Sequence, residues 1–546
     1  MFRICIILFF IINTFAKTQY GNPFSGNFDS NLVKQHLLYF ASDLFGGRGT
    51  GSIGENLASK YIAWHLNLLN IQPFGNENSY YQPVLLHGSL PEEPTKLNIF
   101  VNNDTFNLKL YDDFLIHRPS YRSFIPNPSE LIFVGYGIVA PEYDYNDYSE
   151  LDVTNKLVVF LDGEPQSEDS IYFLGPKPTI HSYIDTKFKT AFSRGAIGAI
   201  LIPSPISYNY KEWSSLVNSY KFEDVSLAFT ISYNLSLILN PSVANLLFLN
   251  SQYSLQDIYQ MHFKNEMKSF KLNSKLTYKA FFKRRDFISF NVIGLIQGND
   301  EKFKDEYIIV SAHYDHLGIG PNINNDSIYN GLLDNALGVA ILLELAKKFS
   351  YAPKSTKRSI MFLFTCAEEK GTLGATYYTN NPKVPLYKTI CNINIDGVPF
   401  IDRFKSIIVI GSEYSDISKM IEPICKKNNL GIKNIPDKFR TYDNFLFSDQ
   451  IAFAQAGIPS FLILDYPDYE NINYDVAIEK LINYSENIYH KPFDDLSISI
   501  NYDAVSQYVE LLYGIIEYIA NSNVEINWNK GTYFYNQRLR TKIERK

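Results

Sequence analysis

Short apolar runs that end in metal-binding side chains dominate the second half of the sequence. One run, 307–310, leads into His313, and another, 359–364, leads into Glu368 and Glu369. Runs of this length are typical of buried strands, and open α/β sheets place their sites beyond the carboxyl ends of their strands. The pattern therefore predicts an α/β fold with a metal-assisted hydrolase site at one edge of its sheet.

Strand-like and helix-like segments alternate as far as residue 520. The expected strands are 307–310, 359–364, 390–395, 406–410 and 460–464, and the expected helices are 335–349, 374–379, 417–427 and 503–520. This alternation predicts a mostly parallel central sheet with helices on both faces. Residues 28–71 add two amphipathic helices, and the glycine-rich segment 46–51 between them is interpreted as a tight turn because it lacks the ending of a phosphate loop.

Residues 93–273 have a different texture. Strand signals at 130–133 and 157–161 accompany one amphipathic helix at 186–193, and the segment has few clusters of carboxylates or histidines. We therefore expect an inserted β-rich module without chemistry of its own. The expected domains are a signal peptide at 1–16, a catalytic domain at 28–92 and 274–522, this insertion, and a loosely attached polar tail at 523–546.

The amino terminus predicts export. Arg3 precedes an apolar run at 4–12, and the small residues Thr14 and Ala16 follow. This is the pattern of a cleavable signal peptide, and the run is too short to cross a bilayer. We expect a secreted or periplasmic protein with no stable membrane insertion after removal of the signal. A retained anchor is the alternative.

Charge and cysteine content exclude other classes. The formal net charge is -7 over 546 residues, so we expect no nucleic-acid partner. Loss of Cys5 with the signal leaves Cys366, Cys391 and Cys425. This odd number indicates no disulfide scaffold, and we expect these cysteines to be small buried residues rather than catalytic ones.

Histidines and carboxylates between residues 307 and 490 could hold two metal ions. Zinc in proteins takes His nitrogen and carboxylate oxygen, and catalytic sites keep a position open for water. Two ions are satisfied if one carboxylate bridges them. The candidate ligands, each at a strand end or in a loop, are His313, Asp334, Glu369, Asp396 and His490.

The adjacent glutamates have different expected roles. Neighbouring residues at the end of a strand point in different directions, so Glu369 can bind metal while Glu368 faces the reacting water as general base. Asp315, two residues after His313, could accept a hydrogen bond from its imidazole and fix the tautomer.

The chain resembles the co-catalytic zinc exopeptidases of metallopeptidase family twenty-eight, which includes aminopeptidase Y and glutamate carboxypeptidase. The matching blocks are Ala312–Asp315, Gly331–Gly338, Ala367–Gly374, Asn394–Val398 and Tyr489–Pro492, with Leu44–Gly51 near the amino terminus. The insertion resembles a protease-associated domain, chiefly at 134–138 and 194–199.

The resemblance implies a role for each matching position. Asp334 matches the carboxylate that bridges two Zn²⁺ per chain, His313 and Asp396 match ligands of one ion, and Glu369 and His490 match ligands of the other. Glu368 matches the general base. Tyr489 matches a tyrosine that hydrogen-bonds the tetrahedral oxyanion in several members, and a packed aromatic is its alternative role. Gln450 stands where many relatives have histidine, which puts any role of that histidine in doubt.

A secreted di-zinc aminopeptidase is the main hypothesis. A metal-bridging hydroxide, deprotonated by Glu368, would attack the first peptide carbonyl of a peptide substrate, and Glu368 would then protonate the leaving amine. A carboxypeptidase for acidic C-terminal residues is the runner-up, with Arg440 as the nominated cation. A glutaminyl cyclase and a non-catalytic receptor-like protein are further alternatives, against which the complete ligand set speaks. A homodimer is possible.

Overall fold

The computed structural model describes residues 26–167, 169, 172–173, 175, 179–204, 212–352, 356–439 and 444–543. The expected signal peptide and Cys5 lie outside these residues. Of the described residues, those up to Leu85 and those from Ile288 onward form one compact unit, unit 1, and Leu86–Phe287 form a second, unit 2. Two long strands, β2 (Tyr81–Val101) and β12 (Ser269–Ile296), run from one unit into the other.

Unit 1 is built on the mostly parallel sheet that the sequence predicts. Its strands follow the order β19-β18-β20-β17-β13-β16-β12, with β1 paired to β12. The central strands β17, β13 and β16 are parallel to one another, whereas β12 and β18 are antiparallel to β16 and β20. The strands are β1 (Gln72–Pro73), β13 (Tyr307–His313), β16 (Ser359–Thr365), β17 (Thr389–Asn394), β18 (Ser406–Ile410), β19 (Gly431–Lys433) and β20 (Ser460–Asp465).

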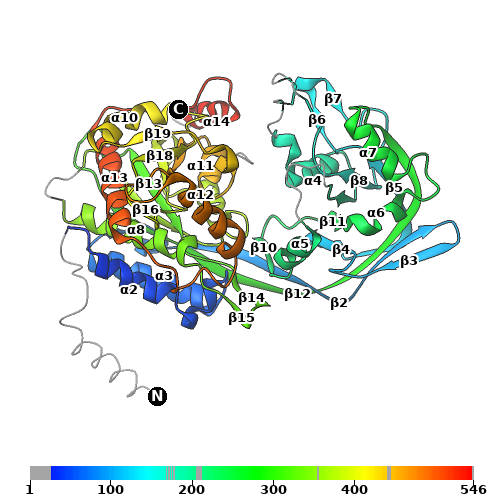
Figure 1. Ribbon diagram of the computed structural model, residues 1–546, viewed down its shortest axis with the longest axis horizontal. Coiled ribbons are helices and arrows are strands. Elements are labelled where there is room, and N and C mark those ends of the chain that lie inside the picture. Colours follow the sequence, from blue (N-terminus) through cyan, green and yellow to red (C-terminus); the bar gives the residue numbers. More distant parts are fainter. Residues whose placement is uncertain are drawn as a thin grey trace, which may run out of the picture. The chain divides into compact units, whose positions relative to one another are not determined.

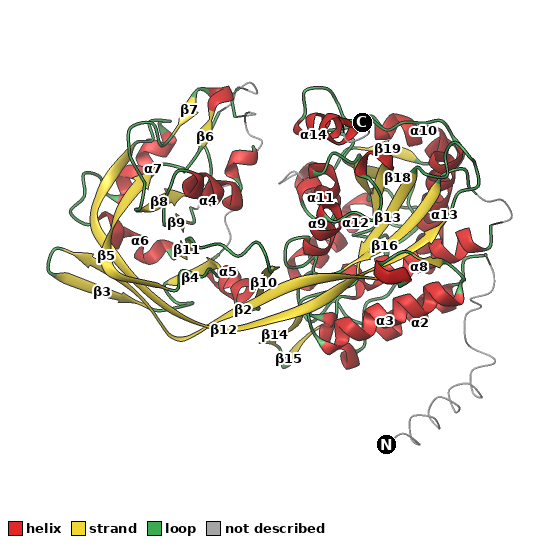
Figure 2. Ribbon diagram, turned by 180° about the vertical axis from the view of Figure 1, so that it is seen from behind, coloured by secondary structure: helices red, strands yellow, loops and turns green. Residues whose placement is uncertain are grey.

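Helices cover both faces of this sheet (Figures 1 and 2). Helices α8, α10 and α13 pack together on one side, and α9 packs with α11 on the other. The helices of unit 1 are α2 (Ser30–Phe40), α3 (Ile53–Leu68), α8 (Leu337–Ser350), α9 (Leu373–Asn380), α10 (Ile417–Lys427), α11 (Gln450–Gln455), α12 (Tyr474–Asn483), α13 (Tyr502–Asn521) and α14 (Tyr533–Ile543).

Buried side chains on alternating strand positions explain this layering. Strand β16 is buried along its whole length, as expected of a parallel strand covered on both faces. Met361 and Leu363 join one core cluster with Tyr378 of α9 and Phe453 of α11. The intervening residues point to the opposite face. Cys366, Cys391 and Cys425 are free and buried, which agrees with the structural role expected for them.

Unit 2 contains more helix than the sequence indicates. A run of parallel strands, β5-β8-β9-β11, is bordered by antiparallel β12 and β4. Its other main strands are β3 (Asp104–Leu108), β4 (Phe114–Arg118), β5 (Phe124–Val134), β8 (Leu157–Leu161), β9 (Gly198–Ile202), β10 (Asp224–Leu227) and β11 (Leu235–Leu239). Its helices are α4 (Ile184–Ser193), α5 (Trp213–Tyr220), α6 (Pro241–Phe248) and α7 (Leu255–Phe263).

The expectation of a single helix in this region is wrong. Helices α5, α6 and α7 are eight or nine residues long, too short for a clear helical period in the sequence. Unit 2 also begins before residue 93 and ends after residue 273. Strand β2 continues through residue 93 and strand β12 through residue 273, so the change in sequence composition does not mark where unit 2 begins and ends.

The expected loose tail is also wrong. Helix α14 packs on unit 1, and Trp528 and Phe534 join a core cluster with Phe445. Arg538 donates hydrogen bonds to the carbonyl oxygens of Leu386 and Thr389 at 3.1 and 2.8 Å. The tail attaches through widely spaced aromatic residues within polar sequence, which leaves no periodic apolar pattern to recognise.

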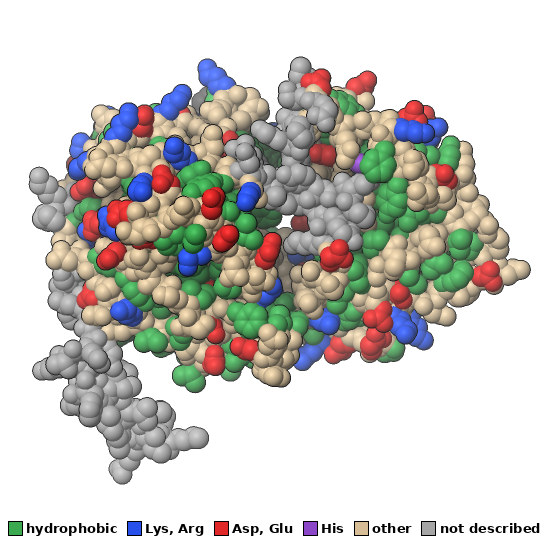
Figure 3. Space-filling model, viewed as in Figure 1, with side chains coloured by type: hydrophobic (Ala, Val, Ile, Leu, Met, Phe, Trp, Pro, Cys, Tyr) green, Lys and Arg blue, Asp and Glu red, His purple; other side chains and the backbone are tan. Residues whose placement is uncertain are grey.

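Acidic and basic side chains are interspersed on the face shown in Figure 3. Among the described residues, no helix combines the length and the apolar character needed to cross a bilayer.

Helices α2 and α3 enclose two buried histidines. Asp29 caps α2 through the backbone N–H groups of Asn31 and Leu32, a regular helix start. The His36 and His65 rings lie 4.7 Å apart, and His36 Nδ1 is 2.9 Å from the Tyr61 hydroxyl. Burial lowers the pKa of His65 to about 4, so folding keeps this imidazole neutral.

Acid should therefore weaken unit 1. Between about pH 6.5 and 4 the unfolded chain binds a proton at His65 that the folded chain does not, so the free energy of unfolding falls as pH drops through this range, by roughly 3 kcal/mol for the full shift. His65→Gln should flatten this dependence in urea titrations at pH 4 to 7. Lys60→Gln, an exposed change on the same helix, should not. Equal slopes for all three proteins would contradict the prediction.

Candidate metal centre

Three strands of unit 1 deliver polar side chains to one edge of the sheet. His313 is the last residue of β13 and is paired with Thr365, the last residue of β16. Asn394 ends β17 beside Ser311 of β13. Because these strands are parallel and end at the same edge, the residues that follow them in sequence, including the two glutamates and Asp396, converge there.

The five predicted ligands form two groups that share Asp334. His313 Nε2 lies 3.3 Å from Asp334 Oδ1 and 3.6 Å from Asp396 Oδ1. His490 Nε2 lies 3.1 Å from Asp334 Oδ2 and 3.3 Å from Glu369 Oε2. Each oxygen of the Asp334 carboxylate therefore faces a different histidine, as a bridging carboxylate must.

These spacings fit zinc. Ligand atoms bonded at 2.0–2.1 Å in a tetrahedral arrangement stand about 3.3 Å from one another, close to the four separations above. His313 Nε2 and Asp334 Oδ2 are buried and, within the described chain, have no hydrogen-bond partner of regular geometry. Buried polar atoms are normally satisfied, and a cation at each group would satisfy both.

Charge within the cluster shifts its titrations in opposite directions. Burial would raise the pKa of Asp334, but the close imidazoles of His313 and His490 lower it well below its ordinary value. Burial raises the pKa of Glu368 well above its ordinary value, and the neighbouring Glu369 adds to the effect against the opposing influence of His313. The carboxylate of Asp334 therefore stays anionic, while that of Glu368 has the higher affinity for a proton.

The turn into the glutamate pair is fixed by the backbone. Ala367 has a φ of 55°, in the left-handed region that residues with a side chain rarely adopt. The N–H groups of Gly371 and Thr372 both donate to the Glu368 carbonyl at 2.8 Å. Glu368 Oε2 lies 4.0 Å from His313 Nε2, farther than either ligand oxygen. Glu369 thus lies closer to the histidines of the cluster than Glu368 does, an arrangement compatible with the different roles expected of the two residues.

Asp315 acts differently from the expectation. His313 Nδ1 lies 3.2 Å from the backbone carbonyl oxygen of Asp315 and 3.8 Å from its carboxylate, so the carbonyl is the partner of the imidazole. The carboxylate accepts hydrogen bonds from the N–H groups of Glu368 at 3.0 Å and Glu369 at 3.4 Å, and from the Thr50 hydroxyl at 3.2 Å. Asp315 therefore ties the end of β13 to the glutamate pair.

Arg48 is a supporting residue that the sequence did not reveal. Its guanidinium is fully buried and donates to four carbonyl oxygens at 2.6–2.9 Å. These belong to the end of α2, the loop after His313, and the loop before Asp334. The four acceptors are Phe40, Tyr314, Asn330 and Gly331. The segment interpreted as a tight turn thus inserts a cation beneath two ligand loops.

Asp494 supports the remaining ligand loop. Its carboxylate accepts hydrogen bonds from the N–H groups of Leu333 and Asp334 at 2.9 and 3.0 Å, and its carbonyl accepts one from Leu332. Asp494 follows His490 by four residues, so it links the loop of His490 to that of Asp334. In the sequence, only its position shortly after His490 could have indicated this role. An aspartate at such a position is not distinctive, because aspartates are common in loops.

Gln450 has a structural role. Its side-chain oxygen accepts a hydrogen bond from Asn394 at 3.0 Å, and its amide nitrogen donates to the carbonyl oxygens of Phe445 and Phe447. Next to it, Asp449 is buried and accepts a hydrogen bond from Thr365. Gln450 therefore fixes the segment around residues 445–448 against the end of β17.

Aromatic rings extend from the metal ligands to a pocket. Tyr489 is 43% exposed, and its ring stacks on His490 with centroids 3.9 Å apart. Tyr484 lies 6.0 Å from Tyr489 and 5.7 Å from Phe400. Burial and the carboxylates of the site raise the pKa of Tyr489 well above its ordinary value, so its hydroxyl remains a hydrogen-bond donor.

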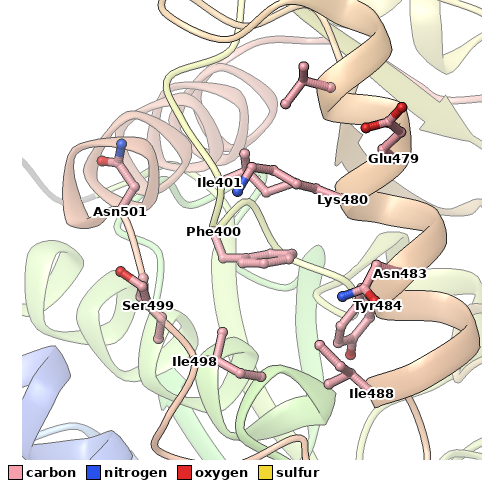
Figure 4. Close-up of a pocket in the computed structure, with 12 residues that line it drawn as sticks. Phe400, Ile401, Glu479, Lys480, Asn483, Tyr484, Ile488, Ile498, Ser499 and Asn501 are labelled. Atoms are coloured by element: carbon pink, nitrogen blue, oxygen red, sulfur yellow. The ribbon is translucent and has the colours of Figure 1, made fainter.

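The pocket has a volume of about 670 Å³. Phe400, Ile401, Ile488 and Ile498 give it an apolar lining, with Glu479 and Lys480 of α12 among its polar residues. In Figure 4 the Phe400 ring lies near the centre of the lining residues, above Ile498. Phe400 follows Asp396 by four residues, and Tyr484 precedes His490 by six, so the pocket adjoins the metal ligands in sequence as well as in space.

The segment that carries this site matches a family of peptidases. Residues 291–516 match the model of Peptidase family M28, and this segment is therefore a Peptidase family M28 domain. It contains all five predicted ligands together with Glu368 and Tyr489.

Curated relatives match the chain over short stretches. The alkaline phosphatase isozyme conversion protein of Escherichia coli is 30% identical over 161 residues, which cover 28% of this chain and 45% of that protein. A probable zinc metalloprotease of Pyrenophora tritici-repentis is 34% identical over 20% of this chain and 24% of its own length. The mouse aminopeptidase NAALADL1 is also 34% identical, over 20% of this chain and 13% of its length. The chain thus spans less than half the length of these relatives.

One solved structure resembles the fold over most of the chain. The aminopeptidase from Aneurinibacillus sp. strain AM-1 has a TM-score of 0.54 and 17% identity, with 92% of this chain and 96% of that chain covered. At this identity the likeness concerns the fold alone.

Arg48 should be indispensable to the stability of unit 1. Arg48→Met leaves four carbonyl oxygens without their donor, and we expect a loss of at least about 3 kcal/mol of unfolding free energy. Arg48→Lys should recover part of it, because an ammonium cannot span four acceptors. Urea unfolding of chelator-treated protein measures both. As a matched control, Arg403→Lys, in a surface ion pair with Glu470, should cost less than about 0.5 kcal/mol. Equal losses at both arginines would contradict this role.

Proposed function

We propose that this protein is a secreted di-zinc aminopeptidase that removes amino-terminal residues from peptides. One observation carries the proposal: Asp334 presents one oxygen to His313 and the other to His490, at separations of 3.3 and 3.1 Å. Export is supported by the sequence of residues 1–16, which lie outside the described part of the chain. A homodimer is compatible with the proposal.

The proposed zinc ligands are His313, Asp334 and Asp396 for one ion, and Asp334, Glu369 and His490 for the other. When bound, a zinc pair lowers the pKa of water and polarises the scissile carbonyl. Distances support the assignment of ligands and base to different residues. The proposed ligand oxygens lie 3.1–3.6 Å from the histidine nitrogens, while Glu368 Oε2 lies 4.0 Å from His313 Nε2.

Glu368 is the proposed general base. Its carboxylate accepts a proton from the attacking water and then donates it to the nitrogen of the leaving amine, so one group serves both transfers. Its raised pKa makes the carboxylate a stronger proton acceptor in the first transfer. The Tyr489 hydroxyl, kept protonated by its surroundings, is the proposed donor to the oxyanion of the tetrahedral intermediate.

The pocket supports a preference for large apolar side chains. A substrate bound beside His490 would meet Tyr489 and Tyr484 and then the apolar lining around Phe400. The volume of the pocket exceeds that of any single side chain, and its charged lining residues, Glu479 and Lys480, are exposed. An acidic side chain would have no buried cation among the described lining residues. Arg440, nominated for the carboxypeptidase alternative, lies outside the described residues.

Substrate assays test the activity directly. We expect release from aminoacyl anilides with a free amine, in the order leucyl and phenylalanyl over glutamyl, and no cleavage of amine-blocked peptides. Zinc measured in the same sample should be two equivalents per chain. Cleavage of a blocked peptide at an acidic C-terminal residue would favour the carboxypeptidase, and full activity with one zinc would favour the cyclase.

Glu368→Gln separates the base from the ligands. The amide keeps the volume of the side chain but cannot accept the proton, so turnover should fall at least about 10²–10⁴-fold with zinc content unchanged. Glu369→Gln is the matched control, which should lose zinc from one position. Retention of turnover by Glu368→Gln would remove Glu368 from the mechanism.

A further inference from the structure

His316 contacts the metal centre although no role has been assigned to it above. Its side chain is completely buried, and its Nδ1 lies 2.6 Å from Glu369 Oε1. Its Nδ1 is also 3.8 Å from Asp334 Oδ2. Together with Asp334 and Glu369, it forms one of the groups of side chains close enough to hold a metal ion.

Distances distinguish a ligand from a hydrogen-bond donor. Two ligands of one tetrahedral zinc stand about 3.3 Å apart, and His490 Nε2 meets this condition with both Asp334 and Glu369. A separation of 2.6 Å is too short for two ligands of one ion and is typical of a charge-assisted hydrogen bond. His316 therefore hydrogen-bonds Glu369 Oε1, the carboxylate oxygen that does not face His490.

The surrounding backbone is shaped to hold the imidazole. Gly331 has a φ of 62°, and a Cβ atom added there would lie 2.5 Å from His316 Cγ. The backbone N–H of His316 donates a hydrogen bond to the carbonyl oxygen of Arg48 at 3.3 Å. His316 Nε2 is buried with no hydrogen-bond partner among the described residues. An N–H at Nε2 would be a buried unsatisfied donor, whereas an N–H at Nδ1 has Glu369 Oε1 as its acceptor.

We propose that His316 is a positioning residue for the second zinc, and that its Nδ1–H donates to Glu369 Oε1 and leaves Glu369 Oε2 as the single ligand oxygen. This inference rests on the proposed two-zinc site. The donor fixes the rotation of the carboxylate before zinc binds and prevents Oε1 from becoming a further ligand. Donors to a ligand of this kind typically contribute 10–100-fold to metal affinity.

Two substitutions of nearly equal shape test the proposal. His316→Asn retains an N–H donor close to the place of Nδ1, and His316→Leu has a similar volume without a donor. The full-length zinc-loaded protein is titrated with a chromophoric chelator, which resolves the two zinc affinities. We expect His316→Leu to weaken one of the two zinc affinities about 10–100-fold and to leave the other within about twofold, and His316→Asn to stay within about threefold of the parent.

Two further measurements exclude a merely structural effect. Chelator-stripped Asn and Leu variants should unfold at the same urea concentration, which separates the donor from packing. In the cobalt-substituted protein, the visible spectrum of His316→Asn should match that of the parent, because no ligand is lost. Equal zinc affinities for His316→Leu and the parent would overturn the proposal, as would failure of Asn to restore affinity. A parent protein that binds fewer than two zinc ions would overturn the proposed function itself.

Discussion

The buried guanidinium of Arg48 makes the interaction on which the rest of the proposed metal centre depends. It joins the end of α2 to the loops that carry His313 and Asp334 through hydrogen bonds to four carbonyl oxygens. Burial lowers its pKa to about 10 against the opposing effect of Asp315 and Asp334, so it remains charged at neutral pH. A fixed positive charge beneath a cluster of carboxylates offsets part of their mutual repulsion before any metal is present.

The carboxylates in turn connect the loops to one another. Asp315 links the end of β13 to the glutamate pair, and Asp494 links the His490 loop to the Asp334 loop. Both carboxylates accept hydrogen bonds from backbone N–H groups. They therefore fix the main chain of these loops, and the main chain in turn positions the predicted ligand side chains. An error in one loop would therefore be transmitted to the others, and this coupling explains why Asp334 and His490, more than 150 residues apart in sequence, come within 3.1 Å of each other.

The sequence predicted the parts of this protein that follow from periodicity and from residue chemistry. Buried strands such as 359–364 and ligands such as His313 and His490 have side chains whose type and position are distinctive. Arg48, Asp494 and His316 were not recognised, because their function is defined by partners brought together only by folding. The Asp315 carboxylate was expected to bind the His313 ring, but it binds the backbone N–H of Glu368. This difference depends on ångström-level placement that residue spacing does not encode. The same reasoning explains the tail, whose attachment depends on isolated aromatic residues such as Trp528.

The division of the chain between the two units has a consequence for its synthesis. The described residues of unit 2 are continuous in the sequence and end at Phe287, whereas unit 1 contains both the helices near residue 30 and the helix that ends at Ile543. Domains generally fold as units in the order of their synthesis. The amino-terminal helices must therefore wait, with their apolar faces uncovered, until α8, against which both pack, has been translated after unit 2. The segment that supplies Arg48 is therefore the part of the chain on which chaperones or the rate of translation would act during synthesis.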